Sequence, residues 1–138
     1  MNTDIRPVLY NSWEAMEFNV NCKEQMMLAE KAKEIGAELF VVDDGWFGER
    51  DGIDNGLGDW YVNERKFPNG LDELVNAVKN SGMMFGIWVE PEMISEDSDL
   101  YRAHPEYAML VPGRENSLGR NQMILDFTNP EVVNYVKD

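Results

Sequence analysis

The sequence predicts an α/β fold in which four strand–helix units follow one another along the chain. Short apolar runs of strand length alternate with longer segments in which apolar residues recur at helical spacing. No low-complexity linker interrupts this alternation. Because strands that alternate with helices of this length pair in parallel through right-handed crossovers, we expect parallel strands in one partial domain that spans residues 1–138.

The first unit begins with a short apolar run, Pro7–Ser12, that leads directly to Trp13. The helix that follows is predicted to start at Asn21, because Glu24 completes the pattern of a capping box. Gly36 is a suitable residue to end this helix, since glycine adopts the left-handed backbone conformation readily.

The second strand, Leu39–Val42, has the sequence LFVV and is expected to be buried on both faces of its sheet. Asp43 and Asp44 follow directly, and Gly45 permits a turn that lets both carboxylates reach one ligand. Ligands of open α/β sheets and of β/α barrels bind beyond the carboxyl ends of the strands. The location of the aspartate pair therefore favours a binding site.

The third unit follows a polar, glycine-rich segment, Glu49–Arg65, whose length is typical of functional or mobile loops. Its helix is predicted to begin near Pro68 and to end at Gly82, because apolar residues between them recur at helical spacing. The apolar run Met83–Val89 is the predicted third strand.

The fourth unit is predicted from a shorter helix, a strand and the start of a last helix. The helix is expected around Glu96–Ala103, and the strand is the apolar run Gln122–Phe127. Asn129 and Pro130 form a suitable cap and first-turn pair for the last helix.

Two architectures fit such units, a doubly wound open sheet and a (β/α)8 barrel. The glycine-rich dinucleotide fingerprint and the phosphate-loop lysine are missing. Instead, polar or aromatic residues stand at the end of every predicted strand, as in barrels whose strand ends contribute the ligand-binding residues. They are Trp13, Asp43, Asp44, Trp88, Glu90 and Asp126. The sequence therefore predicts an α/β fold of the TIM-barrel type, with about half of a (β/α)8 barrel present.

The amino-acid composition restricts the ligands and partners that this protein can bind. The formal charge of −14 opposes binding to nucleic acid or to an anionic membrane, both of which need a basic surface. No apolar run approaches the roughly 20 residues that span a bilayer, and the one cysteine, Cys22, fits a reducing compartment and a place among apolar helix residues. We expect a cytoplasmic protein with a neutral or cationic ligand.

Several motifs, taken in order, resemble the catalytic barrel of the α-galactosidases of glycoside hydrolase family 36. They are RPVLYNSWEA, ELFVVDDGWFGER, LGDWYVNERKFPNGL, FGIWVEPEMIS, HPEY, PGR and GRNQMILDFTNPEV. The resemblance covers nearly the whole chain from Arg6 onward. It implies a hydrolase that removes terminal α-galactosyl residues from melibiose- or raffinose-type oligosaccharides by a retaining mechanism with two carboxylates.

The resemblance also implies roles for five residues. In the family, the aspartates that match Asp43 and Asp44 bind the galactosyl hydroxyls at C4 and C6. The tryptophans that match Trp13 and Trp88 form apolar walls of the sugar subsite, and the arginine that matches Arg120 contributes polar contacts. These roles are chemically sound, because carboxylates accept hydrogen bonds from hydroxyls and indole faces cover the C–H surface of a sugar ring.

The catalytic carboxylates are expected elsewhere. In the family, the nucleophile lies in a Lys-Trp-Asp stretch after the next strand and the acid/base further on, which implies that both fall beyond residue 138. We therefore expect a glycosidase fragment that is inactive alone, needs no cofactor or metal, and derives from a homo-oligomeric enzyme. Met1–Ile5 is interpreted as a start placed on an internal segment.

Two alternatives of other classes remain open. Asp43, Asp44, Glu90 and Asp126 could supply oxygen ligands to magnesium or calcium in a metal-dependent barrel enzyme. The chain could also be an inert truncated half barrel that forms a dimer through exposed strand edges.

Structural roles compete with binding at several positions. Adjacent aspartates also occur in turns and caps, and the glutamates that flank Pro91 fit a solvated rim as well as a site. Packing, capping or another structural role is expected for Trp46, Phe47, Trp60, His104 and Asp126.

Overall fold

A computed structural model describes residues 6–116 and 118–137 of the chain. The interpretation of Met1–Ile5 as a start on an internal segment lies outside the described residues. The chain folds as two compact units. The first contains residues 6–46 and 62–89, and the second contains residues 47–61, 90–116 and 118–137.

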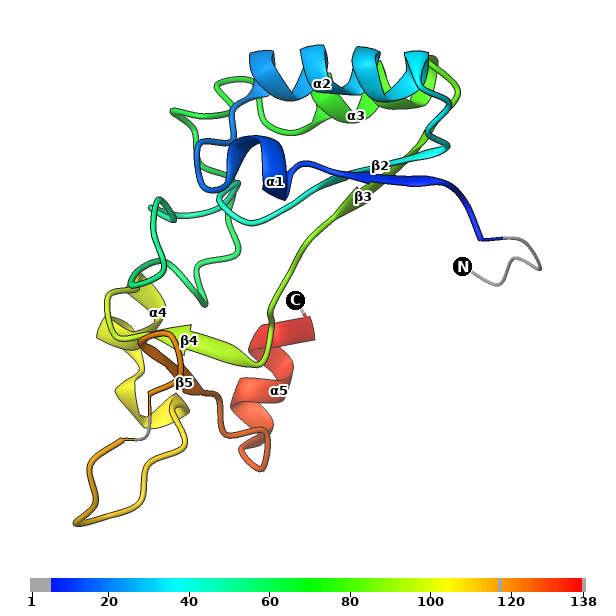
Figure 1. Cartoon of the computed structure of the whole chain (residues 1–138). Coiled ribbons are helices and arrows are strands. Elements are labelled where there is room, and N and C mark those ends of the chain that lie inside the picture. The colour runs from blue at the N-terminus through cyan, green and yellow to red at the C-terminus, as the bar shows by residue number, and fades with distance from the viewer. Residues whose placement is uncertain (1–5, 117, 138) are drawn as a thin grey trace. The chain divides into compact units, whose positions relative to one another are not determined.

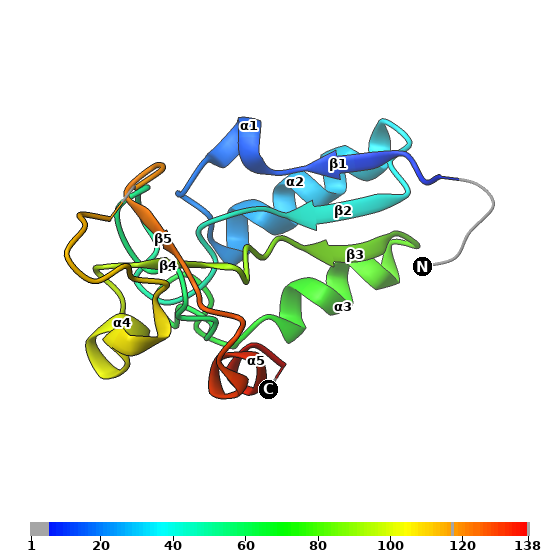
Figure 2. The ribbon, with the colours of Figure 1, turned by 90° about the horizontal axis from the view of Figure 1, so that it is seen from below.

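The first unit is built on a parallel sheet of three strands (Figure 2). They are β1 (Leu9–Asn11), β2 (Leu39–Val42) and β3 (Met84–Ile87), and they lie in the same order in the sheet as in the chain. Both pairings are parallel, as the sequence predicts. This confirms the α/β class and the parallel pairing of the first three predicted strands.

Two helices cover one face of this sheet (Figure 1). They are α2 (Cys22–Glu34) and α3 (Asp72–Asn80), which contact each other and the strands β2 and β3. A short helix, α1 (Trp13–Met16), follows β1. Right-handed crossovers between strands in sequential order place successive helices on the same face, whereas a doubly wound sheet has helices on both faces.

The ends of α2 are those that the sequence predicts. Asn21 is the N-cap: its side-chain oxygen accepts from the Glu24 amide at 3.0 Å, and its side-chain amide donates to the Glu24 carboxylate at 2.6 Å. The first bond satisfies a backbone amide that the first helical turn leaves without a backbone partner, and the second joins the two side chains. Gly36 follows the helix with φ of +88°.

Burial on the second strand differs from the prediction. Phe40 and Val42 are fully buried, but Leu39 and Val41 are only half-buried. Successive strand residues point to opposite faces, and α2 and α3 cover only one of them. The expectation that Leu39–Val42 is buried on both faces is therefore wrong for the described chain.

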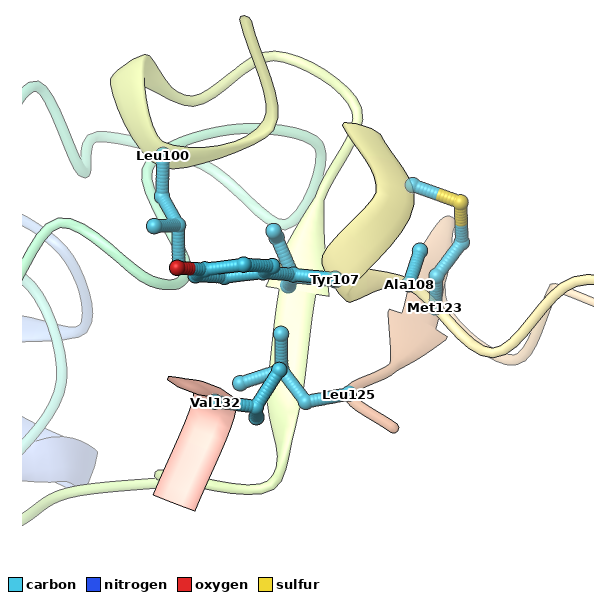
Figure 3. Close-up of a cluster of buried hydrophobic side chains, with 7 residues drawn as sticks. Leu100, Tyr107, Ala108, Met123, Leu125 and Val132 are labelled. Carbon is cyan, nitrogen blue, oxygen red and sulfur yellow. The ribbon is translucent and has the colours of Figure 1, made fainter. Parts of the chain in front are cut away.

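The second unit contains a two-stranded antiparallel sheet with short helices around it. The strands are β4 (Met93–Ser95) and β5 (Gln122–Ile124). The helical segments are α4 (Asp99–Ala103), the 3-10 turn η1 (Pro105–Tyr107) and α5 (Pro130–Lys137). Their apolar side chains form one buried cluster (Figure 3) of Ile94, Leu100, Tyr107, Ala108, Met123, Leu125 and Val132.

The fourth predicted strand needs correction. The apolar run Gln122–Phe127 does begin with a strand, but β5 is short and pairs antiparallel with β4, with Ile94 opposite Met123. It therefore does not extend a parallel sheet, and four parallel strands are not present in the described part of the chain. The last helix does begin at Pro130 after Asn129, whose side chain accepts from the Glu131 amide.

The segment predicted as a long loop is held firmly where it belongs to the second unit. Asp59 is 4% exposed and accepts hydrogen bonds from the backbone amides of Asp99 and Leu100 at 2.9 and 3.0 Å. Burial raises the pKa of Asp59, and the two amides oppose that rise. The Asp59 carboxylate therefore holds the start of α4 against this segment.

Candidate functional site

Four of the five predicted site residues follow the strands of the parallel sheet. Trp13 lies just after β1, Asp43 and Asp44 come directly after β2, and Trp88 directly follows β3. The Trp88 amide donates to the Val42 carbonyl at 2.8 Å, so the ends of β2 and β3 are adjacent. The structure thus brings these residues to the carboxyl end of one parallel sheet, where α/β proteins bind their ligands.

Asp43 is held by donors from two segments. The side-chain amide of Asn11, at the end of β1, donates to Asp43 Oδ2 at 2.5 Å. The Asp44 amide donates to Asp43 Oδ1 at 2.8 Å. The Asp43 amide itself donates to Ser12 Oγ at 3.0 Å. Each carboxylate oxygen and the backbone of Asp43 therefore have a partner within the chain.

Trp13 begins α1 and packs on a neighbouring aromatic ring. Its backbone amide donates to Asn11 Oδ1 at 2.8 Å. Its indole meets Phe18 edge to face, with ring centroids 5.1 Å apart and planes at 89°. Trp13 remains half-buried as a residue, so part of it is exposed to solvent.

The aspartate pair ends in a turn that only glycine fits. Gly45 has φ of +99°, and a Cβ there would lie 2.9 Å from the Phe18 carbonyl oxygen. Lys66 Nζ donates to the carbonyl oxygens of Gly45 and Phe18 at 2.7 and 2.9 Å. Asp44, just before this turn, is 5% exposed. The turn predicted at Gly45 is confirmed, and a lysine that we did not predict holds it in place.

Trp46 supports the end of β3. Its side chain is 6% exposed, and its indole N–H donates to the Trp88 carbonyl at 2.9 Å. In the second unit, the fully buried Phe47 packs on Trp60 with ring centroids 4.3 Å apart. Packing roles for these aromatic residues agree with the sequence interpretation.

Arg120 belongs to the second unit. It lies in the turn before β5 with φ of +53°, and its side chain is 64% exposed. Its guanidinium donates to Glu90 Oε1 at 2.7 Å and to Gln122 Oε1 at 3.3 Å. The sequence allows Glu90 to be part of a solvated rim or of a site, and in the structure Glu90 accepts from the arginine that is predicted to bind sugar.

Asp126 and His104 have the structural contacts that the sequence predicts. Asp126 Oδ1 accepts from the hydroxyl and the amide of Thr128, and these bonds hold the pKa of Asp126 below its ordinary value. His104 ends α4, stacks on Tyr107 with centroids 4.5 Å apart, and lies 3.0 Å from Glu106. Neither arrangement suggests a catalytic group.

Cys22 is likewise structural. It is buried at the start of α2, and burial, reinforced by the nearby Glu73 carboxylate, raises the pKa of its thiol. A thiol with a raised pKa carries little reactive thiolate at neutral pH.

The metal-dependent alternative finds no support in the described residues. Among residues 6–116 and 118–137, no group of three or more His, Cys, Asp or Glu side chains is arranged to hold a metal ion. Asp43 accepts from Asn11, Glu90 pairs with Arg120, and Asp126 accepts from Thr128, so at least three of the four proposed ligands have other partners. Flanking indoles suit a sugar ring better than a hydrated cation.

Three supporting residues were missed in the sequence. Asn11 and Ser12 bind Asp43, and Lys66 holds the Gly45 turn. The available signal was a pair of short polar residues at the end of an apolar strand, beside the first tryptophan. Such pairs are also common in plain turns, so the pattern alone does not identify their partner.

Curated proteins similar to this chain are α-galactosidases. The chain is 52% identical over 131 residues to α-galactosidase AgaA of Geobacillus stearothermophilus, covering 95% of this chain and 18% of AgaA. It is 48% identical over 132 residues to an α-galactosidase of Escherichia coli, covering 96% of this chain and 19% of that protein. The chain thus spans about a fifth of the length of these relatives.

Solved structures of such enzymes have the same fold over the matched part. A crystal structure of the family 36 α-galactosidase AgaB of Geobacillus stearothermophilus matches with a TM-score of 0.91 and 52% identity, covering 95% of this chain and 18% of that one. The α-galactosidase TtGalA of Thermus thermophilus, solved with stachyose, matches with a TM-score of 0.81 and 26% identity, covering 97% and 29%. The family model described as melibiase matches residues 1–138, and this chain therefore belongs to the melibiase family.

Proposed function

We propose that this chain supplies the galactose-binding part of an α-galactosidase of glycoside hydrolase family 36. The observation that carries the proposal is the position of Asp43 and Asp44 at the carboxyl end of a parallel sheet, with Trp13 and Trp88 at the ends of the flanking strands. The family membership of the chain supports the same function.

The chemistry of the four residues suits a galactosyl group. A carboxylate offers about four acceptor sites, so Asp43 keeps about two after it has accepted from Asn11 and from the Asp44 amide. Trp13 and Trp88 are half-buried and can cover the apolar C–H surface of a sugar. Asp43 and Asp44 would bind the galactosyl hydroxyls at C4 and C6, and Arg120 would add polar contacts.

The proposed architecture is a partial (β/α)8 barrel. Strands β1, β2 and β3 would be consecutive barrel strands, and α2 and α3 would belong to the outer helical ring. Sequential strand order and helices on one face of the sheet support this arrangement. The antiparallel pair of β4 and β5 would then lie in an insertion after the third barrel strand. That residues 1–138 form one partial barrel domain remains a prediction.

The bond-breaking step is assigned to residues outside this chain. In the proposed retaining mechanism, a carboxylate nucleophile forms a glycosyl-enzyme intermediate and a second carboxyl group acts as acid and then as base. Residues 1–138 would orient the sugar against these groups. Holding a substrate in reactive geometry can supply a large part of the rate enhancement, so this assignment still places catalytic importance on Asp43 and Asp44.

Substrates, assembly and location are proposed from the relatives and from composition. Solved relatives are in complex with stachyose and raffinose, and we propose α-galactosides of this type as substrates of the complete protein. We also propose a homo-oligomeric enzyme in the cytoplasm, and a dimer of this chain through the edges of β1 and β3 when it is isolated. Within residues 6–116 and 118–137, each helix is too short or too polar to span a bilayer.

The proposal is tested by titrating the 15N-labelled chain with galactose, using glucose as the control. These sugars differ in configuration at C4, where the aspartate pair would bind. We expect galactose to shift the NMR signals of the Trp13 and Trp88 indoles and of the Asp43 and Asp44 amides, with much smaller shifts from glucose. Equal shifts from both sugars, or none in a folded chain, would contradict the proposal.

A further inference from the structure

We propose that Asn11 is a positioning residue of the sugar site, because one side-chain amide orients Asp43 and fixes the backbone of Trp13. The inference rests on the function proposed above and assigns a task to a residue within the same site. Asn11 is the last residue of β1, and it lies level with Val41 of the neighbouring strand. Its side chain therefore leaves the sheet close to where Asp43 follows β2.

The first half of the task is to fix the Asp43 carboxylate. The terminal torsion of an aspartate is broad, so an unrestrained carboxylate samples many directions. Asn11 Nδ2 anchors Oδ2 at 2.5 Å, while the Asp44 amide anchors Oδ1 at 2.8 Å. Hydrogen bonds to a charged acceptor are strong, and two of them define the plane of the group. The remaining acceptor sites of Asp43 then point in fixed directions.

The second half of the task is to hold the start of α1. This helix has four residues and is too short to be stable without tertiary support. Ser12 occupies the N-cap position but makes no side-chain capping bond, since its hydroxyl accepts from the Asp43 amide. Asn11 Oδ1 takes over by accepting from the Trp13 amide at 2.8 Å. The same side chain thus connects the proposed indole wall to the proposed sugar-binding carboxylate.

Only a short side chain with both a donor and an acceptor can perform both tasks. Aspartate at this position would keep the acceptor for the Trp13 amide, but it would lose the donor and place a second negative charge beside Asp43. Alanine would lose both bonds. The two substitutions therefore separate the orientation of Asp43 from the stability of α1.

The experiment compares galactose binding by the full 138-residue chain and its Asn11→Asp and Asn11→Ala variants. Asn19→Asp is the matched control, because it adds the same charge at an exposed asparagine of the same unit. NMR titration with galactose gives Kd, and thermal unfolding gives the midpoint. We expect Asn11→Asp to bind galactose about tenfold more weakly than Asn19→Asp, about the effect of losing one charge-assisted hydrogen bond. Repulsion between the two carboxylates lowers the unfolding midpoint as well, so Kd is measured at a temperature at which both variants are folded.

A charge-exchange variant, Asn11→Asp combined with Asp43→Asn, guards against unfolding of the single variant. It restores a donor–acceptor pair between the two positions but moves the carboxylate to the wrong one. We expect an unfolding midpoint close to that of the unmodified chain, because the hydrogen-bonded pair is restored, and no binding of galactose, because the carboxylate is no longer at position 43.

The outcomes separate the two proposals. If the unmodified chain does not distinguish galactose from glucose, the proposed function is wrong. If it does, but Asn11→Asp binds galactose as tightly as Asn19→Asp, the positioning role alone is wrong. Binding of galactose by the charge-exchange variant with unchanged Kd would show that no carboxylate is needed at position 43, and the positioning role of Asn11 would then be wrong as well.

Discussion

Asp43 and Asp44 differ in their surroundings although they are neighbours in the chain. Asp43 is half-buried, and its oxygens accept from Asn11 and from the Asp44 amide. Asp44 is 5% exposed and precedes the constrained Gly45 turn. A carboxylate offers about four acceptor sites, and two of those of Asp43 are used by Asn11 and the Asp44 amide. Sugar hydroxyls are therefore suitable additional donors to Asp43.

The Asp126 carboxylate carries a prediction about acid stability. Its pKa is lowered in the folded chain, first by the Thr128 hydroxyl and then by the Thr128 amide. Its contribution to the free energy of unfolding is therefore complete above the ordinary pKa of 3.8 and is lost as pH falls through the lower folded value. We expect Asp126→Asn to make the free energy of unfolding less dependent on pH below 3.8.

Urea unfolding at several pH values measures this effect. Glu115→Gln, which removes an exposed carboxylate of the same unit, is the control. An Asp126→Asn chain with the same acid dependence as the unmodified chain would show that the bonds to Thr128 do not favour the ionised form.

At the scale of elements, the turn from β2 into the following segment sets the position of the aspartate pair. Three features define this turn. Gly45 has a left-handed backbone conformation and lies close to the Phe18 carbonyl. The Lys66 ammonium donates to the carbonyl oxygens of Gly45 and Phe18. Because the turn directly follows Asp44, a change in its backbone would move the carboxylates.

Two glycine substitutions separate backbone strain from steric overlap at this turn. Gly36 and Gly45 both have positive φ, but a Cβ at Gly36 meets nothing within 4 Å, whereas a Cβ at Gly45 lies 2.9 Å from Phe18 O. We expect Gly36→Ala to lower the free energy of unfolding by about 1 to 2 kcal/mol, and Gly45→Ala to lower it by about 1 to 3 kcal/mol more. Equal losses in urea unfolding would mean that the turn relaxes away from Phe18.

Local patterns predicted the elements whose signals are local. The capping pair of Asn21 and Glu24 marked the start of α2, and the apolar run before the aspartates marked β2. The partner of β5 was predicted wrongly, because an apolar run does not reveal whether its neighbour is parallel or antiparallel. The strand β4 was missed for another reason: it has only three residues, and the strand with which it pairs lies beyond a long connection.

Among the site residues, too, those with a local sequence signal were predicted and those that depend on distant partners were missed. Trp13, Asp43, Asp44 and Trp88 were predicted because they stand at strand ends, which sequence alone can indicate, and the family resemblance gave them roles. Asn11 and Lys66 were missed because their partners depend on how the backbone turns after β2. Side chains that support a site have weaker sequence signals than the residues that end its strands.

At the scale of the whole molecule, the chain matches about a fifth of each enzyme to which it is similar. Among the described residues, β1 and β3 are the edge strands of the sheet, and in the proposed closed barrel further strands would pair with them. The proposed activity then requires this segment to work with the rest of such a barrel. A chimera that carries residues 1–138 in place of the matching segment of AgaA provides that setting, since the two are 52% identical.

The most direct measurement is kcat/KM for raffinose with this chimera and its Asp44→Asn and Asp44→Ala variants, together with their melting temperatures. A hydrogen bond to a charged acceptor is worth about 1.5 to 3 kcal/mol. We expect an active chimera in which Asp44→Ala lowers kcat/KM by about tenfold or more, with part of the loss in kcat, and in which Asp44→Asn is milder because its amide keeps one acceptor. If Asp44→Ala instead lowers the melting temperature and leaves the kinetics of the folded chimera unchanged, Asp44 is a turn residue and the sugar-binding account is wrong.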